Sequence, residues 1–220
     1  VNAQRNFLTF AVYSTMFPYT SAGPIVRYTD IETQLKQRTI NISKFGIGAE
    51  LFVKGLAKKV LLADNLSVLY SSICGHPQMS VFTSWLGILA YTMQLYFDFS
   101  GYSDMAIGLG KMLGFDFNKN FDYPYISTSV SEFWRRWHIS LGSWFRDYIY
   151  IPLGGNRVST LKHIRNILVV WALTGLWHGA SWNFVLWGVY YGLFLLLEKF
   201  VLQKYLKKIP SWLCTVYTML

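Results

Sequence analysis

The segment that decides the fold is residues 166–197, NILVVWALTGLWHGASWNFVLWGVYYGLFLLL, which contains no Asp, Glu, Lys or Arg. Its apolar part, residues 167–197, would form a helix of about 46 Å, whereas the hydrocarbon core of a bilayer is about 30 Å thick. Two complete crossings would need about 40 residues. We therefore predict a broken or overlong helix, interrupted within residues 177–183, with the interruption buried in protein.

The composition of the whole chain indicates the same class of protein. Of 220 residues, 53% are hydrophobic and 14% are charged, against roughly 25% charged residues in a soluble domain. Such a chain is too apolar to be disordered and too poor in charge to cover a soluble surface. The net charge of +9 comes from basic residues that border the apolar runs, so we interpret it as a charge facing anionic membrane lipid and not nucleic acid.

The domain organisation follows from the ends of the chain. No signal peptide follows Val1, and the apolar run from Trp212 stops at Leu220. The two cysteines, Cys74 and Cys214, lack the spacing of a metal site. We expect a single transmembrane domain over residues 1–220, incomplete at both ends. It would be an internal piece of an all-α, polytopic integral membrane protein with no metal.

Two further regions are predicted to be helical. Residues 81–97 are uncharged and lead into residues 98–104, whose Gly, Ser and Asp favour a turn. After that turn, small residues recur every fourth position at Ala106, Gly110 and Gly114, which lets helices approach closely, and Gly108 is also interpreted as a packing glycine. Residues 45–70 suit either an amphipathic helix near the lipid headgroups or an imperfect span flanked by Lys.

A surface helix is predicted to begin at Ser129, where Ser129 and Glu132 have the spacing of a capping box. Apolar residues then recur at steps of three and four up to Tyr148, with arginines on the opposite face. This pattern is typical of a helix that lies in the membrane interface. His138 falls among the apolar positions, so we expect its side chain to point away from water.

His178 is the only ionisable residue of the deciding segment. It lies 12 residues past Asn166, or about 18 Å along a helix, near the middle of a bilayer. Such a residue is either functional or a hydrogen-bonded link between helices, and the residues alone favour neither. The same alternatives hold for His138, with the structural one favoured. His163 stands between Lys162 and Arg165 and is interpreted as solvated.

Four stretches, in this order, resemble the membrane-bound O-acyltransferase family and, within it, the bacterial alginate O-acetylation branch. They are FPYTSAGPIVRY (17–28), QLYFDFSGYSD (94–104), FWRRWHISL (133–141) and GLWHGASW (175–182). The resemblance implies an all-helical membrane fold with a central funnel. It places the near-invariant histidine of the family at His178, and a position that holds Asn or His at His138.

The resemblance also implies the reaction and its setting. The donor substrate is an acyl-CoA thioester, with acetyl-CoA expected first, which enters from the cytoplasmic side; no cofactor is bound. The acceptor is an exopolysaccharide or another cell-envelope molecule, reached directly or through an extracytoplasmic partner acetyltransferase. The expected location is the bacterial inner membrane, with several spans.

In the mechanism that we expect, His178 is the general base that takes the proton of the acceptor hydroxyl, and His138 positions the substrate or stabilises the oxyanion. Trp134, Trp137, Trp177 and Trp182 would exclude water, which otherwise hydrolyses the thioester. Arg135, Arg136 and Arg146 would attract the phosphates of the donor, or anchor the helix to anionic lipid. Two other readings stay open: D-alanyl or other acyl transfer to teichoic acid, and a non-catalytic transporter or assembly subunit.

Overall fold

The computed structural model describes residues 5–20 and 22–219, and every regular element in those ranges is helical. This confirms the predicted all-α class. Ser21 of the predicted motif at residues 17–28, and the two ends at Val1 and Leu220, lie outside the described residues. The chain divides into two compact units, Val1–Asn120 and Phe121–Leu220.

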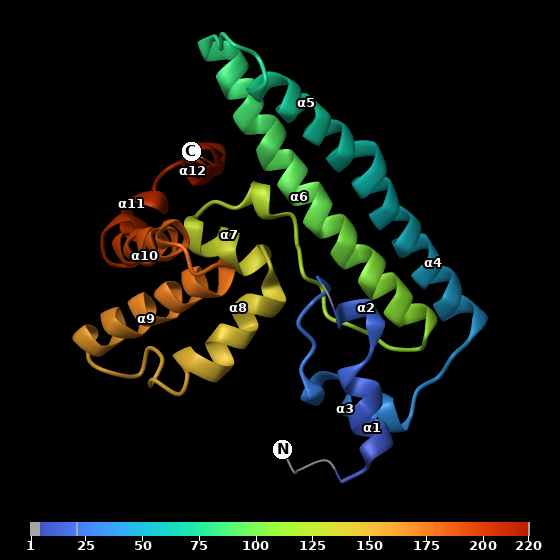
Figure 1. Ribbon diagram of the computed structural model, residues 1–220. Coiled ribbons are helices and arrows are strands. Elements are labelled where there is room, and N and C mark those ends of the chain that lie inside the picture. The colour runs from blue at the N-terminus through green and yellow to red at the C-terminus, as the bar shows by residue number, and fades with distance from the viewer. Residues whose placement is uncertain (1–4, 21, 220) are drawn as a thin grey trace. The chain divides into compact units, whose positions relative to one another are not determined.

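The helices of each unit follow one another along the chain (Figure 1). The first unit holds α1 (Phe7–Ser14), α2 (Phe17–Thr20), α3 (Tyr28–Lys36), α4 (Ile42–Ala57), the π-helical segment η1 (Lys58–Ala63), α5 (Asp64–Cys74) and α6 (Val81–Met112). The second holds the 3₁₀ turn η2 (Pro124–Ile126), α7 (Val130–Arg136), α8 (Ile139–Phe145), the π-helical segment η3 (Arg146–Tyr150), α9 (Thr160–His178), α10 (Trp182–Leu197), the π-helical segment η4 (Glu198–Leu202), α11 (Gln203–Leu206) and α12 (Ser211–Met219).

In the first unit, α4, η1 and α5 run on as one rod that lies along α6 (Figure 1). Glycines set the spacing of this helix pair. A Cβ at Gly55 would lie 2.5 Å from the carbonyl oxygen of Gly101, and a Cβ at Gly48 would lie 2.6 Å from that of Gly108. Gly108 is thus confirmed as a packing glycine, and the closest approaches are seven residues apart, or two helical turns.

The turn predicted at residues 98–104 is wrong, because α6 continues without interruption from Val81 to Met112. The two aspartates of this stretch pair with lysines of η1 instead of capping a turn. The Lys59 Nζ to Asp98 Oδ1 distance is 2.8 Å, and the Lys58 Nζ to Asp104 Oδ2 distance is 2.6 Å. Cations on a neighbouring helix therefore allow these carboxylates to stay inside a helix.

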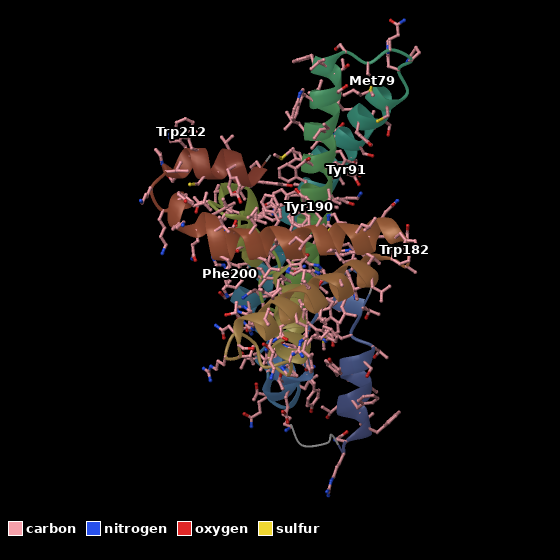
Figure 2. All side chains as sticks on the ribbon, turned by 90° about the vertical axis from the view of Figure 1, so that its left-hand side faces the viewer. Met79, Tyr91, Trp182, Tyr190, Phe200 and Trp212 are labelled. Carbon is pink, nitrogen blue, oxygen red and sulfur yellow. The ribbon has the colours of Figure 1, made fainter. Side chains whose placement is uncertain are left out.

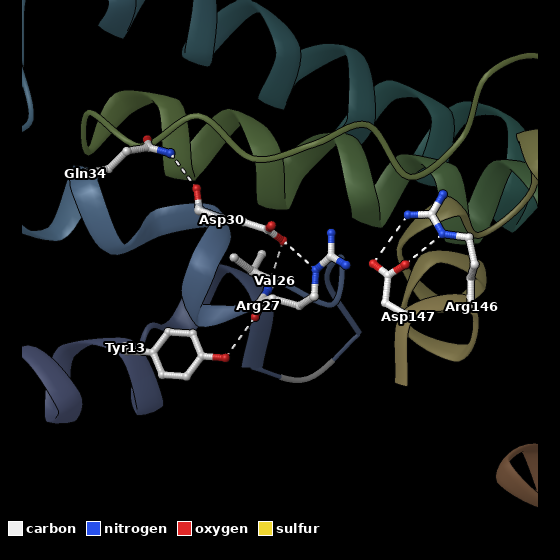
Figure 3. Close-up of polar contacts among 7 residues, drawn as sticks. All are labelled: Tyr13, Val26, Arg27, Asp30, Gln34, Arg146 and Asp147. Atoms are coloured by element: carbon white, nitrogen blue, oxygen red, sulfur yellow. Dashed lines mark hydrogen bonds and ion pairs between the residues drawn. The ribbon is translucent and has the colours of Figure 1, made fainter. Parts of the chain in front are cut away.

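The short helices at the start of the chain are joined by polar contacts (Figure 3). The hydroxyl of Tyr13 donates to the carbonyl of Val26 at 3.0 Å, and the guanidinium of Arg27 pairs with Asp30 at 3.2 Å. Beneath them lies a small apolar core. Its buried members are Met16, Val26, Ile31, Ile107, Phe115 and Phe117.

In the second unit, α9 ends at His178 and α10 begins at Trp182, so the predicted interruption of the deciding segment is confirmed. The two helices fold back on each other through glycines. A Cβ at Gly175 would overlap the carbonyl oxygen of Phe184, and a Cβ at Gly188 would overlap that of Trp171. The break is therefore the turn of a helical hairpin.

The expectation that this break is buried is wrong for the described chain, because Trp177 is exposed and Trp182 is 78% exposed. In Figure 2, Trp182 marks one end of α10, and Phe200 lies toward the other. The predicted length was that of the uncharged segment between Arg165 and Glu198. The helices are longer than this segment, because α9 begins at Thr160 and the helical backbone continues to Leu206. This longer stretch is enough for two antiparallel helices, α9 and α10. The turn that joins them then lies at the exposed end of the hairpin.

One segment of the described chain, Trp182–Leu206, is long and apolar enough to cross a membrane. Its 25 residues would measure about 37 Å as a helix, somewhat more than the thickness of the hydrocarbon core.

Candidate active site

The helix predicted to start at Ser129 does start there. The Oγ of Ser129 accepts a hydrogen bond from the backbone N–H of Glu132 at 3.0 Å, which is one half of the predicted capping box. The other half differs. The carboxylate of Glu132 accepts from the backbone N–H and the hydroxyl of Thr128, both at 2.9 Å, rather than from the N–H of Ser129. Local sequence thus fixes where α7 begins.

The predicted continuous helix is wrong at His138, where α7 and α8 meet. His138 adopts a left-handed backbone with φ +45°, and no Gly or Pro is present at the break. A non-glycine residue in this region costs of order 1–3 kcal/mol, and such residues gather at active sites. The side chain of His138 is only 6% exposed, which confirms that it points away from water.

Burial also sets the charge state of this histidine. Desolvation, with a smaller contribution from the nearby His178, lowers the pKa of His138 from 6.5 to about 4. Near pH 7 the imidazole is therefore neutral, with one nitrogen that donates a hydrogen bond and one that accepts. A neutral imidazole can hold a substrate or donate to an oxyanion without giving up its proton.

His178 is the last residue of α9, at the turn of the hairpin. Its ring lies among aromatic rings, with centroid distances of 4.9 Å to Trp177 and 5.1 Å to Trp187. Within the described chain the imidazole makes no hydrogen bond, so neither nitrogen is committed to a link between helices. The ring of His138 lies 5.9 Å from that of Trp177.

The two histidines, 40 residues apart in sequence, line one cavity of about 180 Å³. Arg146 also borders this cavity. Its guanidinium pairs with Asp147 at 2.7 Å (Figure 3). The full lining is Trp134, Trp137, His138, Leu141, Gly142, Phe145, Arg146, Tyr150, Val170, Trp171, Thr174 and His178. His178 is exposed at the hairpin turn, so the cavity is open on the side of that imidazole, and its aromatic and aliphatic wall can hold a small acyl group.

Trp134 is the centre of an aromatic cluster and has an unused hydrogen-bond donor. Its ring lies edge-on to Trp171 at 5.0 Å and to Tyr191 at 4.9 Å. Its indole Nε1 is buried and has no acceptor within the described chain. A buried donor without an acceptor costs roughly 1–3 kcal/mol, and an oxygen atom of a bound substrate would satisfy it.

A second cavity, of about 830 Å³, adjoins the first and shares Trp134, Tyr150, Val170 and Trp171 with it. The motif at residues 133–141 supplies Trp134 and Arg135 to this cavity, but the cavity itself was not predicted. Its remaining lining residues are Thr128, Ser129, Ser131, Arg135, Ile167, Leu195, Glu198, Lys199, Gln203, Leu206, Lys207, Ile209, Ser211 and Cys214. Its volume suits a ligand of a few hundred daltons.

The solvated reading of His163 is wrong, because the residue is buried beside this second cavity. Its Nε2 lies 3.0 Å from the hydroxyl of Tyr150 and 3.1 Å from the Nζ of Lys199. Burial and the charge of Lys199 lower the pKa of His163. A signal was present in the sequence: Ile167 and Val170, four and seven residues later, share its helix face and line the cavity.

The predicted binding residues fall in different places. Trp134 and Trp137 line the smaller cavity, and Arg135 lines the larger one. Arg136 pairs with Glu132 at 2.8 Å and is among the lining residues of neither cavity. Trp177 contacts the His138 ring and Trp182 is exposed, and these two also line neither. Among residues 5–20 and 22–219, no group of His, Cys, Asp or Glu could hold a metal ion.

Comparisons with known proteins agree on one family. The model of MBOAT, the membrane-bound O-acyltransferase family, matches residues 3–209. A probable alginate O-acetylase AlgI of Azotobacter vinelandii is 50% identical over 197 residues, which are 90% of this chain and 40% of that protein. A peptidoglycan O-acetyltransferase of Helicobacter pylori is 39% identical over 222 residues, 96% of this chain and 42% of that protein.

A relative of lower sequence identity is named for the transfer of D-alanine and not of acetyl groups. A teichoic acid D-alanyltransferase of Bacillus subtilis is 31% identical over 217 residues, 90% of this chain and 52% of that protein. The chain thus spans about two fifths to one half of the length of these relatives.

Proposed function

Because the chain belongs to the membrane-bound O-acyltransferase family, we propose that it carries the catalytic histidines of an O-acetyltransferase of the bacterial inner membrane. Residues 1–220 are then part of one multi-pass transmembrane domain, and the two adjoining cavities are this chain's part of a central funnel. The acetyl group is favoured over D-alanine because the relatives named for acetyl transfer are 50% and 39% identical, against 31% for the D-alanyltransferase.

The observation that carries the proposal is the shared cavity of His138 and His178. Residues so distant in sequence line one small space, and one of them has a strained backbone. The ring nitrogens of His178 are open to a ligand. A cavity with these properties fits acyl transfer better than a purely structural role for the histidines.

The reaction begins when the acceptor hydroxyl attacks the carbonyl carbon of an acetyl thioester supplied from the cytoplasmic side, with acetyl-CoA as the expected donor. His178 takes the hydroxyl proton as the carbon–oxygen bond forms, a step that typically contributes about 10²- to 10⁴-fold in rate. The tetrahedral intermediate then collapses and its carbon–sulfur bond breaks. The departing thiolate takes the proton from the imidazolium of His178, which restores the neutral base.

The negative oxygen of that intermediate needs a hydrogen-bond donor, and the unsatisfied Nε1 of Trp134 can supply one. Neutral His138, in the same cavity, positions the substrate. Donors that already point to the developing charge give some of the largest contributions to catalysis. The surrounding Trp137 and Trp171 exclude the water that would otherwise hydrolyse the thioester. The product is an acetyl ester on an envelope polysaccharide or on an extracytoplasmic partner transferase.

The experiment measures ester-linked acetate on the envelope polysaccharides of a deletion strain that carries the full-length protein or its His178→Ala form. Membrane levels are matched by blotting, and His76→Ala is the control because His76 lies in an exposed loop of the first unit. We expect acetate to be lost only with His178→Ala. Equal acetate in both strains would contradict the proposal, and loss of D-alanine esters instead would replace acetyl by D-alanyl as the group transferred.

A further inference from the structure

Glu198 is a buried acid within the segment that could cross the membrane. Its side chain lies inside Trp182–Leu206 and is 3% exposed. A charged group in such a place costs several kcal/mol unless other groups satisfy it. In the sequence, Glu198 stands out only as the charged residue that ends the uncharged segment 166–197. Its burial therefore calls for partners.

Two partners of Glu198 are the first two backbone N–H groups of α7, and the Tyr217 hydroxyl of α12 lies near the same carboxylate. Its Oε2 accepts from the N–H of Val130 at 2.7 Å, and its Oε1 accepts from the N–H of Ser131 at 3.0 Å. The first N–H groups of any helix lack an acceptor within the helix. In α7 the next two find theirs at Ser129, whose Oγ and carbonyl accept from Glu132 and Phe133. Glu198 thus completes the capping of α7.

These two bonds connect parts of the chain that are 68 and 67 residues apart. One part is the end of the α9–α10 hairpin, which carries His178 at its turn. The other is the start of α7, which carries Trp134 one turn later and leads directly into His138. Because α7 has only seven residues, a shift of its first turn moves the whole helix and the residue that follows it.

We propose that Glu198 is a positioning residue that fixes His138 and Trp134 relative to His178. The carboxylate touches neither the histidines nor the reacting atoms; it acts through the backbone of α7. This inference rests on the proposed function, since it concerns the geometry of the proposed catalytic pair. It adds a residue outside the four motifs to the set that the reaction needs.

The test uses the full-length protein and its Glu198→Ala and Glu198→Gln forms. Glu50→Gln is the matched control, because the Glu50 side chain is 63% exposed and its ion pair, among the described residues, is with Lys54 on its own helix. We expect Glu198→Ala to lower kcat by about 10²-fold with KM for the thioester unchanged, since a misplacement of about 1 Å can cost that much. Glu198→Gln keeps one acceptor oxygen and should recover kcat to within about tenfold of wild type, but not fully.

Hydrogen exchange of the peptide from Ser129 to His138 gives a readout that does not need activity. We expect faster exchange in Glu198→Ala than in wild type or Glu50→Gln. Unchanged exchange, an unchanged kcat, or a raised KM with unchanged kcat would overturn the proposal. If Glu198→Ala does not accumulate in the membrane, Glu198→Gln decides the matter, and a wild-type kcat in that form overturns the proposal. If wild type transfers no acetyl group but exchange responds as expected, the proposed function fails while the link to α7 stands.

Discussion

The two units of the chain pack their long helices by the same means but treat polar groups differently. In each unit glycines let the backbones touch, as Gly55 does against Gly101 and Gly188 does against Trp171. In the first unit, the charges carried by these helices satisfy one another, as in the pair of Lys58 and Asp104. Such groups stabilise the helix pair and are not available to a ligand.

In the second unit, some polar side chains of the residues that line the cavities have no hydrogen-bond partner in the described chain. The ring of His178 makes no hydrogen bond within the described chain, and the Nε1 of Trp134 has no acceptor there. The Oγ of Ser100 in α6 of the first unit is also buried without a partner in the described chain. The difference between the units therefore lies in their ionisable groups: lysines and aspartates pair with one another in the first unit, whereas the His178 imidazole makes no hydrogen bond in the second. We propose that this difference separates a supporting unit from the unit that carries the chemistry, and it can be tested in each.

The largest effect is expected from Gly188→Ala, which tests the glycine contact of the second unit. The added Cβ would overlap the carbonyl oxygen of Trp171, so the α9–α10 hairpin must open. We expect a loss of more than about 3 kcal/mol in stability, with loss of activity, because overpacking against backbone cannot be relieved by a side-chain movement. Thermal unfolding of the purified full-length protein measures the change. A variant as stable as wild type would show that the hairpin is not packed as described.

The next effect concerns His138 and pH. Its folded pKa of about 4 lies below the unfolded value of about 6.5, so its contribution to stability is complete above pH 6.5 and is lost as pH falls toward 4. At pH 5 the loss should reach about 2 kcal/mol. His138→Asn does not titrate, and Asn tolerates the left-handed backbone, so this variant should lack that part of the acid destabilisation. Unfolding temperatures at pH 7.5 and 5.0 measure it; the same acid sensitivity in both proteins would be evidence against a buried, neutral His138.

A smaller effect is expected from Lys58→Met in the first unit. It leaves the partly buried carboxylate of Asp104 without its cation, which should cost about 1–3 kcal/mol. Activity per folded molecule should stay at the wild-type level, because this charge pair has no place in the reaction. Unfolding measurements on Lys58→Met, Asp104→Asn and the double variant give the coupling energy. Additive losses would mean that the two side chains do not interact.

The smallest effect is expected from Gly46→Ala, which contrasts with the glycines at the contacts. A Cβ at Gly46 meets no atom within 4 Å, and the residue lies inside α4. The substitution should stabilise the protein by roughly 0.5–1 kcal/mol through helix propensity alone. Destabilisation on heating would indicate that this face of α4 is in contact with other parts of the protein.

Much of the fold was predictable because its signals are local. The break after His178 and the start of α7 at Ser129 were both expected from neighbouring residues. The burial of His138 was expected from its spacing among apolar residues. Caps, turns and periodicity depend on a few positions along the chain, so the sequence displays them directly.

What the sequence did not show depends on distant partners. Residues 98–104 have the composition of a turn. They form a helix because Lys58 and Lys59 of the neighbouring helix pair with the two aspartates of this stretch. The left-handed backbone of His138 has no Gly or Pro to mark it. Glu198 looked like the border of an apolar run, and the role that we propose for it follows from the distant N–H groups of Val130 and Ser131.

The two histidines of the site were predicted, but the cavity that they share was not. The resemblance to the family singled out His138 and His178, while their shared cavity follows from the α9–α10 hairpin and from the break between α7 and α8. The larger cavity was missed because most of its lining comes from residues outside the four motifs, although the motif at residues 133–141 supplies Trp134 and Arg135. The buried His163 was missed because it lies outside those motifs.

The central claim is that His138 and His178 act together on one reacting group. The most direct measurement is a double-mutant cycle on the rate of acetyl transfer by the full-length protein, with His138→Ala, His178→Ala and both. Residues that act as a unit give strongly non-additive losses. We predict that the double variant is about as slow as His178→Ala alone. Losses that multiply, or a His178→Ala form as fast as wild type, would contradict the account.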